Sequence, residues 1–186
     1  MKKGLKVSNC LQSWMTDLNN LLTEALKHPV FIANEGWAGY RTSDYITRME
    51  TDRNWQERMR LLEPNLWLIH LGVNDERVHL PAETVAQNME TIIQRLCQQH
   101  GAKPERILLA KPSYDYTEGA APILRSYCEQ LDALVKRLGL RPGPDFFDAY
   151  SRDRQRYYGG DPVHPNVAGM ELMAKLWSEA IVKAIL

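Results

Sequence analysis

The sequence of 186 residues has little cysteine, no excess of charge of either sign and no long apolar run. Its three cysteines, Cys10, Cys97 and Cys128, are too few and too scattered for a disulfide framework or for a zinc site with paired ligands. Free thiols are expected, as in a reducing, cytoplasmic setting. No stretch is long enough to span a bilayer, and the basic start, residues 1–7, is not followed by an apolar run of signal-peptide length.

Charge is balanced, with 23 Lys and Arg residues against 23 Asp and Glu residues. A net charge of zero gives no reason to expect nucleic acid or an anionic membrane as a partner. The run of Arg152, Arg154 and Arg156 is interpreted as a solvated loop rather than as an anion site. The length fits one domain over residues 1–186, and the oligomeric state, homo-oligomers included, is left open.

Two common signatures of catalysis are also missing. The sequence contains neither a glycine-rich phosphate loop of the Walker type nor the Gly-x-Ser-x-Gly elbow of ordinary α/β-hydrolases. The spacing of Asp75, Asp161 and His164 does not match a metal-ligand pattern. We therefore expect neither a metal ion nor a cofactor.

Short apolar runs alternate with amphipathic helical patterns along the chain. Strands are predicted at residues 30–33, 66–71, 107–110 and 146–147, and helices at residues 13–28, 43–62, 81–101, 121–138 and from 165 onward. This alternation predicts an α/β fold with a parallel sheet and helices on both faces. In such folds ligands bind at the carboxyl ends of the strands.

Polar loops follow the first two predicted strands. In residues 34–39, Asn-Glu-Gly-Trp-Ala-Gly, two glycines let the backbone turn and present an amide, although a plain turn explains the same pattern. In residues 72–75, Gly-Val-Asn-Asp, the amide of Asn74 is placed to donate to a developing oxyanion. A turn that caps the next element is the alternative.

The segment before the last helix, residues 161–166, reads Asp-Pro-Val-His-Pro-Asn. The spacing brings the Asp161 carboxylate to the His164 ring, where it would orient the imidazole as a general base and acid. A capping aspartate beside a structural histidine is the alternative. His70, inside the most apolar run, is interpreted as a hydrogen-bonded core residue.

Three of these motifs occur in a fixed order: Asn34-x-Gly36-x-x-Gly39, Gly72-x-Asn74-Asp75 and Asp161-x-x-His164-Pro165-Asn166. Together they resemble blocks two, three and five of the SGNH hydrolases, also called GDSL esterases. The resemblance implies a three-layer α/β/α fold with a flavodoxin-like parallel sheet. It also implies Gly39 and Asn74 as the oxyanion hole, His164 as the base and Asp161 as its orienting group.

By the same resemblance the chain is a serine-type ester hydrolase without a cofactor. Its substrate is expected to be a small acyl ester, with carbohydrate O-acetyl groups, lysophospholipids and thioesters all represented among SGNH relatives. Trp37, two residues before Gly39, is placed to stack on a sugar or cover an acyl chain. Packing of the loop onto the domain is the alternative for this side chain.

The first block of the family, Gly-Asp-Ser, is not in the sequence. Three interpretations follow. The chain is truncated relative to the family, with its first strand missing or shortened and sheet edges exposed; or Ser8 has become the nucleophile on a shortened loop; or the protein is a pseudoenzyme whose cleft binds a carbohydrate or another small ligand.

Overall fold

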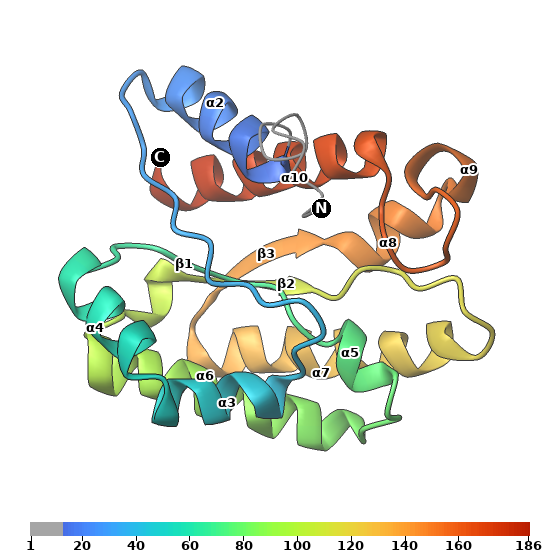
Figure 1. Cartoon of the computed structure of the whole chain (residues 1–186), viewed down its shortest axis with the longest axis horizontal. Coiled ribbons are helices and arrows are strands. Elements are labelled where there is room, and N and C mark those ends of the chain that lie inside the picture. Colours follow the sequence, from blue (N-terminus) through green and yellow to red (C-terminus); the bar gives the residue numbers. More distant parts are fainter. Residues whose placement is uncertain (1–12) are drawn as a thin grey trace, which may run out of the picture.

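The computed structural model describes residues 13–186. It has three layers, with a parallel sheet between two layers of helices (Figure 1). In the described part of the chain the sheet has three strands in the order β1-β2-β3, which are β1 (Trp67–Ile69), β2 (Ile107–Lys111) and β3 (Arg141–Asp145). The predicted α/β class with a parallel sheet is confirmed.

The central strand β2 is buried from Ile107 to Ala110 because helices cover the sheet on both faces. Its side chains alternate between two cores. Ile107 and Leu109 contribute to the core on one face, whereas Leu108 and Ala110 contribute to the core on the other.

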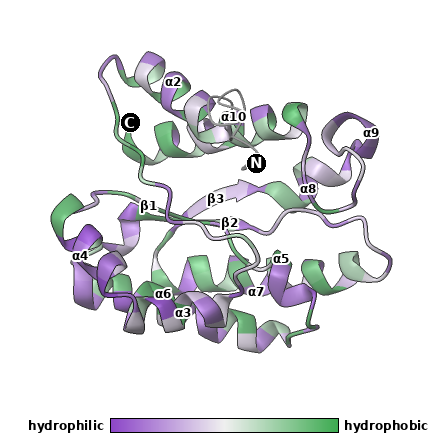
Figure 2. Cartoon of the chain, in the orientation of Figure 1, coloured by the Kyte–Doolittle hydropathy of each residue, from purple (hydrophilic) through white to green (hydrophobic). Residues whose placement is uncertain are grey.

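Four helices form one outer layer: α3 (Thr42–Thr51), α4 (Arg53–Leu62), α6 (Ala82–His100) and α7 (Ala120–Leu138). The other layer is formed by α2 (Trp14–Leu26) and α10 (Val167–Ile185), which pack against each other. Hydrophobic and hydrophilic residues alternate along the helices of both layers, as expected for amphipathic helices (Figure 2). No helix in residues 13–186 combines the length and the apolar character needed to cross a membrane.

Short helices follow the strands on the side where the motifs lie. They are α5 (Val73–Glu76) after β1, and α8 (Phe146–Ser151) and α9 (Arg154–Tyr157) after β3. A 3-10 turn at Pro104–Arg106 precedes β2. Asn74 therefore lies in α5, directly after the carboxyl end of β1, and His164 lies in the segment between α9 and α10.

The helix predicted over residues 43–62 is two helices. Asp52 separates α3 from α4 with an extended backbone at φ −85° and ψ 93°, and its carboxylate accepts a hydrogen bond from Trp55 N at 3.0 Å. Aspartate favours such an N-cap over a helix interior because its short side chain can satisfy a free backbone N–H.

The strand predicted at residues 146–147 is wrong. Phe146 and Phe147 begin α8, which Asp145 caps, and the strand is the preceding Arg-Pro-Gly-Pro-Asp segment. Two prolines suggest a loop, but an edge strand tolerates them because one side needs no hydrogen-bond donors. Gly143 allows β3 to lie close to β2, since an added Cβ would be 2.7 Å from Ala110 N.

Residues 30–33, predicted as a buried strand, do not form one within the described structure. Phe31 is 81% exposed, and the carbonyl of Val30 accepts a hydrogen bond from Asn19 Nδ2 at 2.9 Å. The segment crosses from α2 toward α3 without a ladder partner among residues 13–186. An apolar run cannot by itself distinguish a sheet strand from such a crossing segment.

Candidate active site

His164 and Asp161 meet in the loop between α9 and α10. Imidazole Nδ1 lies 3.1 Å from each oxygen of the Asp161 carboxylate. Asp161 Oδ1 also accepts the backbone N–H groups of His164, at 2.7 Å, and of Val163, at 2.8 Å. These backbone hydrogen bonds, with that from the His164 ring, lower the pKa of Asp161.

The ionised carboxylate holds the proton of the imidazole on Nδ1 and leaves Nε2 to exchange a proton with a substrate or nucleophile. The side chain of His164 is 83% exposed, so solvent reaches the imidazole. The pairing predicted from the sequence is therefore present.

The loop is fastened by Asn166, which caps α10. Its Oδ1 accepts from Gly169 N at 3.0 Å, while Nδ2 donates to the carbonyls of Arg156 at 3.0 Å and Tyr158 at 3.2 Å. Tyr158 also forms an antiparallel bridge with Pro165. The side chain of Asn166 thus adds three bonds to the main-chain bonds that hold the His164 loop, and the sequence motif alone does not reveal them.

Gly39 and Asn74 are brought together through the carbonyl of Tyr40. Gly39 sits in a turn with φ +78°, a backbone conformation that favours glycine, and Asn74 Nδ2 donates to Tyr40 O at 3.0 Å. A carboxamide nitrogen carries two N–H groups, so one remains after the bond to Tyr40. The two predicted oxyanion donors are therefore neighbours.

Asp75 joins the same two loops from inside. Both of its oxygens lie 3.1 Å from Thr42 N, and the Thr42 hydroxyl donates to Oδ1 while accepting from Asn88 Nδ2 at 2.9 Å. Burial raises the pKa of Asp75, and the bonds from Thr42 oppose that rise. This role for Asp75 was not predicted, because its partner lies 33 residues earlier in the chain.

His70 has the hydrogen-bond partner expected from the sequence, but the residue is partly rather than fully buried. Its Nε2 lies 3.3 Å from Ser113 Oγ, and its ring centroid lies 4.6 Å from that of Phe146. Burial lowers the pKa of His70 to about 4, which keeps the imidazole neutral near pH 7.

Trp37 lies on the loop of Gly39 and is 56% exposed. Its ring stacks on that of Tyr40 with centroids 5.8 Å apart, so the loop that contains Gly39 carries two aromatic side chains. The candidate nucleophile Ser8 lies outside the described residues, as does Cys10.

The arginine run after α8 is exposed, as predicted, but it includes a helix rather than being all loop. Arg152 pairs with Asp148, and the guanidinium of Arg154 lies 5.1 Å from the ring centroid of Tyr116. Arg152 and Arg154 therefore make contacts within the protein surface, an ion pair and a cation–π contact.

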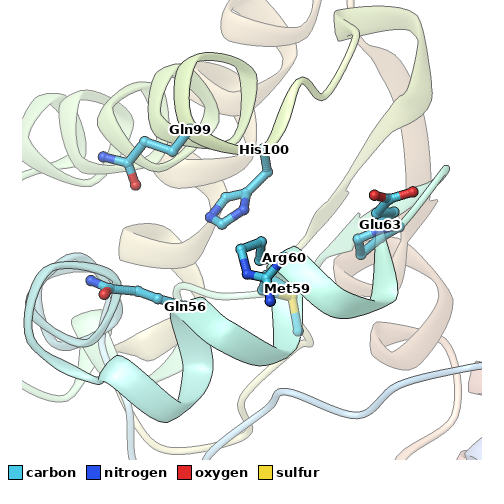
Figure 3. A pocket seen from close by; sticks show the side chains of 7 residues that line it. Gln56, Met59, Arg60, Glu63, Gln99 and His100 are labelled. Carbon is cyan, nitrogen blue, oxygen red and sulfur yellow. The ribbon is translucent and has the colours of Figure 1, made fainter.

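A hollow elsewhere on the molecule is not lined by residues of the three sequence motifs. It lies between α4 and the end of α6 and is lined by Gln56, Met59, Arg60, Glu63, Gln99 and His100 (Figure 3). None of the predicted motifs contributes to it. The candidate active site is therefore assigned to the motif loops.

Comparison with known proteins agrees with the arrangement of the motifs. The model of the GDSL-like lipase/acylhydrolase family matches residues 3–172. A search of the curated proteins finds no match.

Solved structures of similar fold include TesA, at 17% identity and a TM-score of 0.76, with 98% of this chain and 93% of TesA covered. The acetylxylan esterase Axe2 of Geobacillus stearothermophilus is 18% identical, with a TM-score of 0.70 and coverage of 94% and 81%. The lipase/acylhydrolase of Enterococcus faecalis is 19% identical, with a TM-score of 0.69 and coverage of 89% and 85%. These similarities confirm the expected SGNH-type fold.

Proposed function

Because the chain belongs to the GDSL-like lipase/acylhydrolase family, we propose that it hydrolyses small acyl esters with His164 as general base and Asp161 as its orienting group. Family membership supports ester hydrolysis as the general chemistry. The observation that supports these roles is the position of imidazole Nδ1, 3.1 Å from both oxygens of Asp161. Gly39 and Asn74 are proposed as the donors of the oxyanion hole.

In the proposed reaction a serine hydroxyl attacks the ester carbonyl and passes its proton to Nε2 of His164. The Asp161 carboxylate stabilises the imidazolium, while Gly39 N–H and the second N–H of Asn74 stabilise the negative oxygen. The proton then moves to the departing alcohol, leaving an acyl-serine. Water attacks this acyl group by the same route and releases the carboxylic acid.

Acetylated carbohydrates are the first substrates to test. Axe2 is an acetylxylan esterase, and the exposed Trp37 beside Gly39 offers an aromatic face of the kind that stacks on sugar rings. Lysophospholipids and thioesters serve as comparison substrates, because they differ in the group that leaves the acyl carbon.

The test is turnover of p-nitrophenyl acetate, together with intact-mass analysis and peptide mapping after treatment with a fluorophosphonate. The expected result is one adduct on a serine, with Ser8 the candidate, and loss of turnover. His164→Ala should lower the labelling rate and kcat by about 100- to 10,000-fold, whereas His28→Ala, at an exposed position after α2, should change neither.

The second candidate function is a non-catalytic module that binds carbohydrate or another small ligand. The absence of a Gly-Asp-Ser block from the sequence favours it. Folded protein that shows no adduct and no turnover, yet binds an acetylated xylo-oligosaccharide saturably by calorimetry, would replace the hydrolase proposal with this one.

A further inference from the structure

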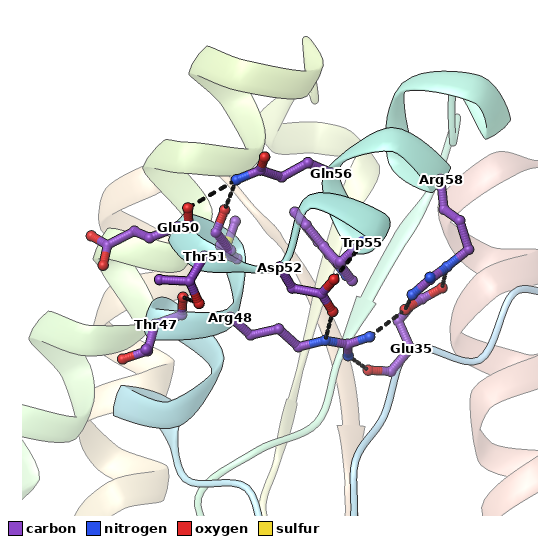
Figure 4. A network of polar contacts seen from close by, with 10 residues as sticks. Glu35, Thr47, Arg48, Glu50, Thr51, Asp52, Trp55, Gln56 and Arg58 are labelled. Atoms are coloured by element: carbon purple, nitrogen blue, oxygen red, sulfur yellow. Dashed lines mark hydrogen bonds and ion pairs between the residues drawn. The ribbon is translucent and has the colours of Figure 1, made fainter.

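The loop of residues 34–40, here called the oxyanion loop, rests on a buried arginine of α3 (Figure 4). The side chain of Arg48 is 4% exposed. Its Nη1 donates to the carbonyl of Glu35 at 2.8 Å, Nη2 to the Glu35 carboxylate at 2.9 Å, and Nε to the carboxylate of Asp52 at 3.2 Å. Its guanidinium carbon lies 4.8 Å from the ring centroid of Trp37.

Such burial is costly for a cation unless opposite charges and hydrogen bonds compensate for the lost water. Here two carboxylates supply the charge, and one of the three bonds goes to the main chain of the oxyanion loop. A bond to the main chain fixes the path of the backbone, which a bond between exposed side chains does not.

Arg58 of α4 provides a contrast within the same network. It binds the Glu35 carboxylate with two bonds, Nε at 3.0 Å and Nη2 at 2.8 Å, but its side chain is 44% exposed. Both bonds of Arg58 reach the carboxylate of Glu35. Arg58 therefore binds only the side chain of Glu35, whereas Arg48 binds both its side chain and its backbone carbonyl.

The far end of the oxyanion loop is fixed as well. Asn74 Nδ2 donates to Tyr40 O, and Thr42 N donates to Asp75. Gly39 lies between the anchor at Glu35 and the anchor at Tyr40. The direction of its N–H therefore depends on both anchors, and a displacement of about 1 Å in such a donor can cost on the order of 100-fold in rate.

We propose that Arg48 is a positioning residue that holds the oxyanion loop through the Glu35 carbonyl and the Trp37 ring, and so keeps Gly39 N–H aligned with the Asn74 amide. This inference rests on the proposed function. Arg48 acts through the loop and does not touch the reacting atoms.

The first test compares Arg48→Lys with Arg58→Ala by steady-state kinetics on p-nitrophenyl acetate. Lysine keeps the charge but cannot make the planar set of three bonds. Arg48→Lys should lower kcat by about 10- to 100-fold with KM changed less than about 3-fold, because an interaction made in the transition state is lost. Arg58→Ala should keep kcat within about 3-fold.

A second readout is independent of turnover. In ¹⁵N–¹H spectra the Gly39 amide and the Trp37 indole signals should shift in Arg48→Lys and stay in place in Arg58→Ala, while signals from α10 stay constant in both. If Arg48→Lys does not fold, Glu35→Gln weakens the carboxylate bonds to both Arg48 and Arg58. Arg58→Ala alone should leave the Gly39 amide signal in place, so a shift of that signal and a loss of kcat of about 3- to 10-fold, the size expected for a weakened charged hydrogen bond, are assigned to Arg48.

Unchanged kcat and an unmoved Gly39 signal in Arg48→Lys, or in Glu35→Gln where that variant replaces it, would overturn the inference. So would an equal loss of kcat in Arg48→Lys and Arg58→Ala. If the unaltered protein hydrolyses no ester, the proposed function fails by that result alone, and the Gly39 signal still decides whether Arg48 holds the loop.

Discussion

A single carboxamide, that of Asn74, connects α5, which follows β1, to the loop before α3. One N–H is bound to Tyr40 O, and the other is the proposed oxyanion donor. Asn74→Ala should lower kcat by about 100- to 1000-fold, because loss of one such donor removes stabilisation of the transition state. Asn65→Ala, which removes a carboxamide from the exposed turn before β1, is the matched control and should keep the rate of p-nitrophenyl acetate hydrolysis.

An Asn74→Ala enzyme with unchanged kcat would assign the oxyanion role to other donors. A rise in KM at constant kcat would instead indicate that the carboxamide binds the ground state as strongly as the transition state.

His70 makes the stability of the protein depend on pH. Its pKa is about 4 in the folded chain and 6.5 as the ordinary value, so the unfolded chain binds more protons between these limits. The contribution of a neutral His70 to the free energy of unfolding is therefore complete above pH 6.5. It is lost as the pH falls toward 4, and the free energy of unfolding is lower by about 2 kcal/mol at pH 5.

Urea unfolding at pH 7 and pH 5 measures this effect. His70→Gln retains a partner for Ser113 but does not titrate, so the drop in free energy of unfolding between the two pH values should be smaller by that amount. His28→Gln, at an exposed site, should retain the full drop. Equal drops in the unaltered protein and in His70→Gln would show that His70 is protonated without cost in the fold.

At the scale of the element, Asn166 has two functions at once. It caps α10 and ties the His164 loop to the carbonyls of Arg156 and Tyr158. Asn166→Ala should lower the free energy of unfolding by about 1 to 2 kcal/mol and should also lower kcat, because the loop that orients His164 loses its fastening.

Ser13→Ala is the control, since Ser13 caps α2 in the same way but belongs to no motif. Chemical denaturation of Ser13→Ala should show a loss of stability without a loss of kcat. If both variants lose stability and neither loses activity, the bonds from Asn166 Nδ2 do not position the loop.

Sequence reasoning succeeded for elements whose signals are local. Gly101 and Gly139 end α6 and α7 in the left-handed conformation, and the predicted helices stop at these residues. It failed where local and tertiary signals disagree: the apolar pair Phe146 and Phe147 predicts a strand where a helix begins, and the pattern over residues 43–62 predicts one helix where Asp52 separates two.

The same distinction holds within the candidate site. Asp161 and His164 are three residues apart, so their contact could be predicted from spacing alone. The contact of Thr42 with Asp75 spans 33 residues and that of Arg48 with Glu35 joins a loop to a helix, so both depend on packing that no local pattern encodes. The motifs identify the groups proposed for the reaction, whereas only the structure shows what holds them.

For the whole molecule, the layer of α2 and α10 supplies one of the cores that flank the sheet. Trp177 of α10 is almost fully buried there and packs edge-on against Phe146, with centroids 5.9 Å apart. Trp177→Ala should lower the free energy of unfolding by about 3 to 5 kcal/mol, because it leaves a large cavity.

The measurement is guanidinium denaturation, with Met170→Ala, at an exposed position of the same helix, as the control expected to cost about 0.5 kcal/mol or less. A small effect of Trp177→Ala would mean that α10 can shift to close the cavity. Loss of kcat in Trp177→Ala protein that is still folded would show that this shift reaches the His164 loop at the start of α10.

The pairing of α2 with α10 also bears on how the chain acquires its structure. These helices come from opposite ends of the described sequence, whereas α6 and α7 are near neighbours along the chain and pack against each other. The layer with α6 and α7 can form early during synthesis, but among the described elements the main partner of α2 is α10, which is made last. Until then the apolar side of α2 and one face of the sheet stay uncovered, so the nascent chain is most exposed to aggregation and to chaperone binding just before translation reaches α10.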